Sequence, residues 1–287
     1  MMDIYTLSTP RFRLRVTPQS AAILNFDDVG SGTAILRPYQ RDTGWHPGES
    51  ALFPMLPLAN RVRDNRFCLA GREICLPDSA LDNQFFLHGD GWLQRWQLQD
   101  LSCTHIALGL RVQHSCGFDY SASLVYRLTD EGLSAHLTLR HCGAEPMLYG
   151  LGFHPFFVKT PQTQIQFSSS GYWPEGELHL PLAWQGDTPT ELDFTRTKVP
   201  DNAWMNHGYS GWNGVAHLAT PNQPTISLHS SAPYLMLFQI PDEPFICFEP
   251  QSHPVDAHNM DGQPGLVLLG KGEVTEMGMR VEVGGRS

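Results

Sequence analysis

Apolar and polar side chains alternate over much of the chain. The alternation is clearest in residues 11–16, 106–112, 133–139 and 277–283. Because successive side chains of a strand point to opposite faces of a sheet, a period of two predicts half-buried β-strands. The short polar segment 129–132 ends in glycine, which predicts a hairpin within residues 120–140.

Long segments with an apolar period of 3.6 residues are missing, so helices are predicted to be few and short. Strands that follow one another without intervening helices favour antiparallel sheets packed face to face. We therefore predict an all-β protein, a large antiparallel β-sandwich. No linker, repeat or shift in composition marks a boundary, which predicts a single domain over residues 1–287. The Pro/Gly-rich segment 170–200 is predicted to run over the surface.

The composition agrees with this fold class and limits the partners. Hydrophobic residues make up 41% of the 287 residues, enough for a sizeable core, while 26 Gly and 22 Pro indicate many turns. The net charge of -10, with only 19 Lys and Arg together, argues against a nucleic-acid partner. A neutral small molecule is a more natural ligand for this chain.

The cysteines and the apolar runs bear on location. The six cysteines include no CxxC pair, and the first residues lack a basic segment followed by an apolar one. No apolar run approaches the roughly 20 residues that cross a bilayer. We expect reduced thiols, a cytoplasmic location, no membrane contact, and either a monomer or a homodimer.

Glu249 closes the apolar run Phe245–Phe248 and is followed at once by Pro250. This pattern places a carboxylate at the mouth of a predicted buried strand. Burial disfavours the ionised form and raises a carboxyl pKa, which makes a usable general base. A salt-bridged residue at a strand end is the alternative, and this segment by itself does not distinguish the two.

His88 and His154 lie in equally apolar settings, beside phenylalanines and before Gly89 or Pro155. Each is predicted to lie near the end of a strand or the start of a turn. Either can be a structural residue with satisfied hydrogen bonds. Together with Glu249 they can instead form an acid and base pair. Opening a cyclic hemiacetal requires one proton to leave the anomeric hydroxyl and another to reach the ring oxygen, and a carboxylate with an imidazole can do both near neutral pH.

Other kinds of chemistry have weaker support. The sequence contains no HExxH motif, no GxSxG elbow and no glycine-rich phosphate loop. The one compact group of His and carboxylate, residues 253–258, lies in a Pro-containing loop and is expected to be solvated rather than metal-bound. We therefore predict neither a metal nor a cofactor. One or two of the seven tryptophans and eight tyrosines are expected to pack against a sugar ring.

Four short motifs occur in an order that resembles the aldose 1-epimerases, or galactose mutarotases. They are Pro57-Leu58-Ala59-Asn60-Arg61-Val62 with Gly71, Leu87-His88-Gly89 with Trp96, Gly152-Phe153-His154-Pro155-Phe156-Phe157, and Phe248-Glu249-Pro250-Gln251. The similarity runs from about Phe53 to the C-terminus. The resemblance implies a β-supersandwich fold and the cofactor-independent interconversion of the α and β anomers of a free hexose.

The resemblance also implies a role for each matching residue. Glu249 matches the base that takes the anomeric hydroxyl proton, and His154 matches the acid that protonates the ring oxygen. His88 matches the histidine that holds the reacting end of the sugar, and Arg61 the arginine that binds hydroxyls or orients the carboxylate. The family usually has an aspartate where this chain has Asn206, which can still bind a hydroxyl but lacks the charge. This departure indicates a divergent branch of the family.

Two other functions remain open on the same scaffold. A hexose-6-phosphate 1-epimerase would need a basic pocket, for which Arg37, Arg41, Arg63 and Arg66 are the candidates. A non-catalytic carbohydrate-binding protein is the second alternative, motivated by the asparagine at position 206. Competition by a phosphorylated hexose tests the first, and sugar binding without mutarotation would favour the second.

Overall fold

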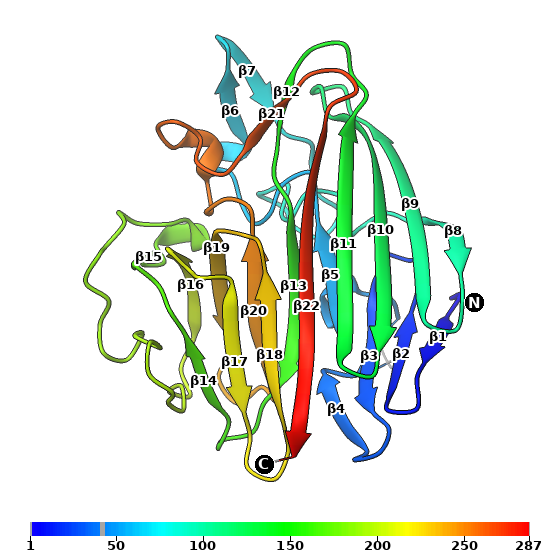
Figure 1. The fold of residues 1–287 in the computed structure, drawn as a ribbon. Helices are drawn as coiled ribbons and strands as arrows, with labels where there is room; N and C mark the ends of the chain where they lie inside the picture. Colours follow the sequence, from blue (N-terminus) through cyan, green and yellow to red (C-terminus); the bar gives the residue numbers. More distant parts are fainter. Residues whose placement is uncertain (1, 41–43, 287) are drawn as a thin grey trace.

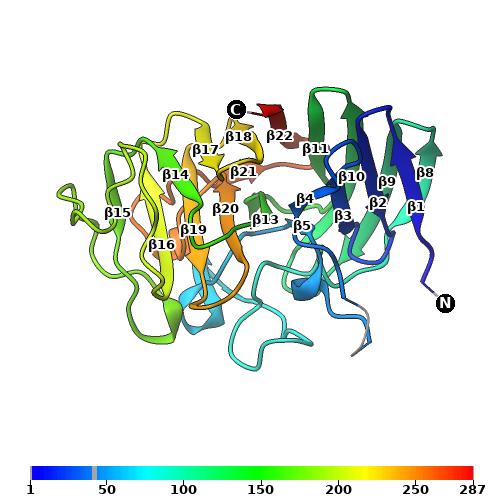
Figure 2. The same cartoon turned by 90° about the horizontal axis from the view of Figure 1, so that it is seen from below.

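The computed structural model describes residues 2–40 and 44–286. Two large antiparallel sheets, one of ten strands and one of eight, form the molecule (Figure 1). Figure 2 shows the same sheets from below as two layers that lie face to face. The predicted all-β sandwich is confirmed.

The ten-stranded sheet has the order β1-β2-β3-β4-β13-β20-β19-β16-β15, and β5 pairs with β13 and β3. Its strands are β1 (Tyr5–Ser8), β2 (Phe12–Val16), β3 (Ile23–Asp28), β4 (Thr33–Leu36), β5 (Leu52–Met55), β13 (Gly152–Val158), β15 (Gly171–Trp173), β16 (Met205–Ser210), β19 (Tyr234–Gln239) and β20 (Phe245–Gln251). Strands β1 to β4 follow one another in the chain, whereas β13 lies between β4 and β20, which come from remote parts of the sequence.

The eight-stranded sheet has the order β14-β17-β18-β22-β11-β10-β9-β8. Its strands are β8 (Gln97–Leu101), β9 (His105–Gln113), β10 (Asp119–Thr129), β11 (Gly132–His141), β14 (Gln164–Phe167), β17 (Val215–Ala219), β18 (Pro224–Ser230) and β22 (Val274–Arg286). Two further pairs complete the strands: β6 (Arg66–Leu69) with β7 (Arg72–Cys75), and β12 (Met147–Tyr149) with β21 (Val267–Leu269).

The predicted hairpin forms from β10 and β11, and Thr129 pairs with Gly132 at its turn. The last predicted strand is found as β22. Helical structure in the described residues is limited to four short 3-10 turns, which confirms the expectation of few helices. These turns are η1 (Pro47–Glu49), η2 (Arg63–Asn65), η3 (Glu177–His179) and η4 (Ala257–Asn259). No helix of the described chain is long and apolar enough to span a membrane.

Two separate apolar clusters lie on the two faces of the ten-stranded sheet. Ile246 and Phe248 of β20 belong to the main core, which also includes residues from both sheets. Phe245 and Cys247, which alternate with them, belong to a smaller cluster with residues of β5 and the 85–93 loop, such as Phe53. The alternation of β20 thus gives the sheet a second buried face, on which the polar residues described next are found.

Candidate active site

The pairing of β13 with β20 brings a carboxylate and an imidazole together. Phe156 pairs with Cys247, and continuing this register two residues along sets His154 across from Glu249. His154 Nε2 lies 3.2 Å from Glu249 Oε1. The two residues are only 7% and 2% exposed, yet both line a cleft of about 200 Å³. The two residues that the sequence suggests as acid and base therefore line the same cleft.

The position of both residues within their strands differs from the prediction. Glu249 does not close its strand, because β20 continues through Gln251, and His154 is the third residue of the seven-residue β13. The two strands pair at Gly152 with Gln251 and again at Phe156 with Cys247, and the pairing is interrupted between these positions. Pro155 and Pro250 lie in this interval and have no amide hydrogen to donate. Proline therefore interrupts pairing locally without ending either strand.

Burial sets the protonation of this pair. It disfavours the charged form of each group, raising the pKa of Glu249 to about 8 and lowering the pKa of His154 to about 3. A hydrogen bond from Gln251 Nε2 to Glu249 Oε2, at 3.1 Å, and the charge of Arg61 partly offset the effect on Glu249. The resting pair is therefore a neutral carboxyl group beside a neutral imidazole.

His88 is held by two hydrogen bonds with the backbone of Asn60, one through its imidazole and one through its own backbone. The Asn60 amide donates to His88 Nδ1 at 3.1 Å, and the His88 amide donates to the Asn60 carbonyl at 2.9 Å. Because Nδ1 accepts, the ring proton of neutral His88 is on Nε2, which leaves an N–H donor for a ligand. The pKa of His88 is well below its ordinary value, chiefly because of burial. As predicted, His88 lies at a turn, with φ of 57°.

Arg61 follows Asn60 and also lines the cleft. Its Nη1 donates to Asn60 Oδ1 at 3.1 Å, and burial lowers its pKa although Asp82, Glu249 and Glu175 attract its charge. Among the described residues that line the cleft, Arg61 is the one Lys or Arg.

Of the arginines proposed to bind a phosphate, the three that the structure describes do not join Arg61 at the cleft. The residues that line the cleft include none of Arg37, Arg63 and Arg66, and Arg41 lies outside the described residues. Arg63 instead pairs with Asp256 at 3.3 Å. The described part of the chain thus has no cluster of cations at the cleft.

The sheet order β13-β20-β19-β16 places β16 on the other side of Glu249 from His154, and we call this side the opposite wall of the cleft. It includes Asn206 of β16, Trp204 just before it, and His179 of η3. All three donate hydrogen bonds to one carboxylate, that of Glu175, at 2.5 to 2.6 Å. Burial disfavours the charge on Glu175, but these hydrogen bonds outweigh it, and its pKa is lowered. Glu175 therefore remains ionised behind this wall.

The segment 253–258 is not solvated, contrary to the prediction. His253 and His258 are buried, with 0% and 2% exposure. His253 Nε2 accepts from the Ala59 amide at 3.1 Å, and the Asp256 amide donates to the Arg61 carbonyl at 3.0 Å. The loop is buried because its polar groups satisfy the backbone of the segment that carries Arg61.

One group of side chains in the described chain has donors suited to a metal. The ligand atoms of His154, Cys247 and Glu249 all lie within 4.8 Å of one another. Imidazole, thiolate and carboxylate are typical ligands of zinc. The expectation that the protein works without a metal stays a prediction.

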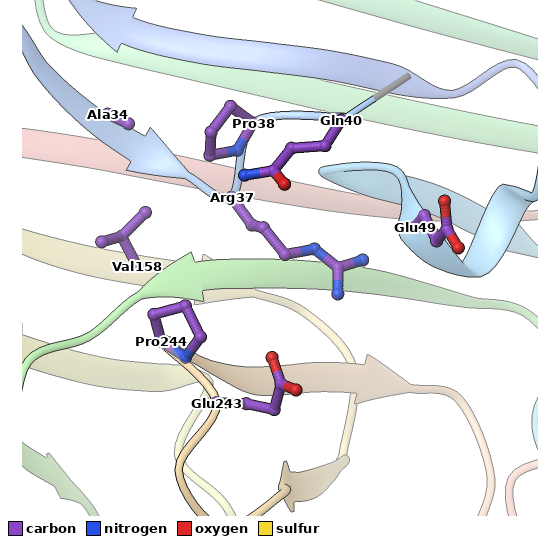
Figure 3. A pocket seen from close by; sticks show the side chains of 8 residues that line it. All are labelled: Ala34, Arg37, Pro38, Gln40, Glu49, Val158, Glu243 and Pro244. Atoms are coloured by element: carbon purple, nitrogen blue, oxygen red, sulfur yellow. The ribbon is translucent and has the colours of Figure 1, made fainter. Parts of the chain in front are cut away.

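A larger hollow, of about 560 Å³, lies near the same sheet (Figure 3). Figure 3 shows Arg37 reaching between Glu49 and Glu243 at this hollow. The Arg37 guanidinium lies 3.8 Å from the ring centre of Phe156, which in turn stacks on His154 at 4.5 Å. Neither His154 nor Glu249 lines this hollow, so it is separate from the cleft.

Comparison with known proteins identifies the family. Residues 3–282 match the family model of aldose 1-epimerase, so the chain belongs to that family. Over 294 residues it is 36% identical to the uncharacterized protein YphB of Escherichia coli K12, covering 98% of this chain and 99% of that protein.

Solved structures agree with the sequence comparison. The crystal structure of a candidate aldose 1-epimerase from Escherichia coli K12 matches with a TM-score of 0.92, 35% identity and 99% coverage of both chains. A galactose 1-epimerase from Lactobacillus acidophilus NCFM matches with a TM-score of 0.80 at 17% identity, covering 99% of this chain and 95% of that chain. At this identity the second match shows the fold alone.

The cleft brings together all five residues singled out from the sequence: Arg61, His88, His154, Asn206 and Glu249. Sequence reasoning missed Glu175, His179 and Trp204. Two of these lie in the irregular segment 170–200, which was predicted only as a surface excursion. No periodicity marks this segment. Its role depends on the pairing of β15 with β16, which places the residues after β15 beside the start of β16.

Proposed function

We propose that this chain is an aldose 1-epimerase that interconverts the α and β anomers of a free, neutral hexose without a cofactor. The observation that supports this most directly is the 3.2 Å contact between His154 Nε2 and Glu249 Oε1 at the cleft. The reaction needs one group that accepts a proton and another that donates one. An imidazole and a carboxyl group in contact can provide both.

The reaction begins with transfer of one proton within the pair. A neutral carboxyl group beside a neutral imidazole has the same number of protons as a carboxylate beside an imidazolium. Transfer from Glu249 to His154 therefore gives the reactive form without a proton from solvent. Glu249 then takes the proton of the anomeric hydroxyl while His154 delivers its proton to the ring oxygen, and the C1 to ring-oxygen bond breaks.

Closure of the ring completes the reaction. Rotation about the C1 to C2 bond exposes the other face of the aldehyde to the hydroxyl that attacks it. The acid and base then exchange roles, as microscopic reversibility requires. His154 takes the proton of the attacking hydroxyl, and Glu249 gives a proton to the new anomeric oxygen, which leaves a carboxylate beside an imidazolium. Transfer of the proton from His154 back to Glu249 then restores the neutral resting pair.

The remaining cleft residues bind and orient the sugar. His88 can donate from Nε2 to an oxygen at the reacting end, because its Nδ1 is used by the Asn60 amide. Arg61 supplies the positive charge that stabilises the Glu249 carboxylate formed during the reaction. Asn206 offers a polar contact from the opposite wall. We also propose that the chain works as a single domain.

Polarimetry on freshly dissolved α-glucose and α-galactose tests this function. The wild-type protein is expected to accelerate the decay of optical rotation above the buffer rate. Glu249→Gln, which keeps the shape but cannot take a proton, is expected to lower kcat by at least about 100-fold. The matched control is Glu276→Gln, which removes an exposed carboxylate from β22 and is expected to leave the rate unchanged.

The same assay separates the two alternatives. If the wild-type protein binds sugars but accelerates no member of a panel of neutral aldoses, a carbohydrate-binding protein is the better description. If phosphorylated hexoses react faster than free ones, the protein is better described as a hexose-6-phosphate epimerase. The single arginine and the nearby ionised Glu175 favour a neutral sugar over a phosphate dianion.

A further inference from the structure

Glu175 connects three cleft residues without lining the cleft itself. Its Oε1 accepts from Asn206 Nδ2 and from His179 Nδ1, both at 2.5 Å, and its Oε2 accepts from Trp204 Nε1 at 2.6 Å. Three donors from two different segments thus converge on one carboxylate, which lies two residues after the end of β15. We call Glu175, His179, Trp204 and Asn206 the carboxylate-anchored wall.

The carboxylate determines how Asn206 faces the cleft. An ionised carboxylate only accepts hydrogen bonds, so the amide nitrogen of Asn206 must point toward Glu175. The amide oxygen is then the group left for a ligand, and no hydrogen bond of the described residues reaches it. Asn206 therefore offers an acceptor, which is also what a carboxylate at this position would offer.

The same reasoning applies to the other two members of the wall. With Nδ1–H of His179 donated to Glu175, its Nε2 is free for a ligand. Trp204 donates its indole N–H to Glu175 and packs edge-on against Phe238 at 5.4 Å, yet 43% of the residue remains exposed. A large aromatic ring that is fixed in orientation and exposed at a cleft suits the C–H face of a pyranose.

We infer that Glu175 is a positioning residue for sugar recognition, and that Asn206 with Glu175 performs the task of a single aspartate at position 206. Asn206 supplies the acceptor for a hydroxyl of the sugar, and Glu175 supplies the charge that orients and polarises it. This inference rests on the proposed function, because it assigns the wall to the binding of the same neutral hexose. It predicts a ligand with a hydroxyl donor and an apolar C–H face on this side.

A charge-exchange cycle at the two positions tests the inference. Glu175→Gln places an amide against donors that need an acceptor, and is expected to raise KM by about tenfold with a small change in kcat. Asn206→Asp alone sets two carboxylates against each other and is expected to raise KM by a similar factor. In the double variant the new amide at position 175 can donate to the new carboxylate at position 206, so KM is expected to return to within about threefold of wild type.

The controls separate positioning from folding. Glu177→Gln changes an exposed glutamate of the same segment and is expected to leave KM unchanged. Asn206→Ala removes the proposed acceptor without adding charge and is expected to match Glu175→Gln in KM. Thermal unfolding of each variant identifies loss of structure, which would lower the amount of active protein and kcat rather than raise KM selectively.

Sugar binding is measured in parallel by tryptophan fluorescence and calorimetry. The inference is overturned if Glu175→Gln binds sugar as wild type does, or if the double variant is no better than the two single changes combined. If wild type accelerates no mutarotation but binding still follows the cycle, the proposed function fails while the wall is supported. A wild-type protein that binds no hexose overturns both.

Discussion

At the scale of single residues, the cleft is governed by the cost of burying charge. Glu249 and His154 both lie where desolvation favours their neutral forms, by raising one pKa to about 8 and lowering the other to about 3. Because the two groups are in contact, they titrate as a pair rather than separately. Between about pH 3 and pH 8 the pair holds the one proton that the proposed mechanism uses.

This protonation predicts the pH dependence of the reaction. We expect kcat/KM, after subtraction of the buffer rate, to be flat between about pH 5 and pH 7. It should fall above about pH 8, by about tenfold per unit, because the deprotonated pair has no proton for the ring oxygen. Polarimetry over this range measures the profile. A rise in kcat/KM through pH 8 would instead mean that ionised Glu249 works alone as a base and that the acid is another group.

At the scale of elements, alternation and turns together build the cleft. Strands β13 and β20 carry His154 and Glu249 on the face turned away from the main core, and a loop carries His88 over that face. The loop depends on Gly89, whose φ is 68° and where an added Cβ would lie 2.3 Å from the Leu56 carbonyl oxygen. No side chain fits there without displacement of the backbone.

The tight turn gives a prediction on stability and activity. Gly89→Ala is expected to destabilise the protein by at least about 1–3 kcal/mol and to lower kcat/KM, because the shifted turn moves His88. Gly32→Ala is the matched control, since Gly32 also has a φ of 68° but no atom within 4 Å of the added Cβ. Urea unfolding measures both variants. Equal destabilisation would show that the positive φ, rather than the contact with Leu56, accounts for the cost.

At the scale of the whole molecule, charge bears on the choice of substrate. The chain carries a net charge of -10, and Arg61 is the one Lys or Arg among the described residues that line the cleft. The overall field therefore opposes a dianionic ligand, and the charge of Arg61 is already offset in part by the ionised Glu175. The predicted cytoplasmic location, the oligomeric state and the single-domain organisation stay predictions.

Steady-state kinetics with each sugar as the substrate test this view. Glucose 6-phosphate is expected to have a kcat/KM at least about tenfold below that of glucose at low ionic strength, because no second cation lines the described part of the cleft to offset the ionised Glu175. Added salt should narrow the difference by screening the repulsion. A phosphorylated hexose that outperforms the free sugar would contradict the assignment to neutral hexoses.

Much of the fold could be predicted because the strands carry their own pattern. The hairpin of β10 and β11 and the last strand β22 follow directly from alternation and turn residues. Four of the five site residues could be named because each lies in a short motif that resembles the family, and Asn206 because it stands where the family usually has an aspartate. Glu175 could not, since nothing near it in sequence distinguishes it from a surface carboxylate. The burial of His253 was also missed, because its partner is the remote Ala59 amide.

The sequence by itself determined the class of fold, the order of the motifs and which side chains can exchange protons near neutral pH. These depend on local periodicity and on the chemistry of individual residues. Only the tertiary structure decided that His154 and Glu249 touch, that one arginine rather than several faces the described part of the cleft, and that Glu175 anchors the opposite wall. Those facts depend on pairings between strands far apart in the chain, where burial and hydrogen bonding are set by neighbours that no local pattern specifies.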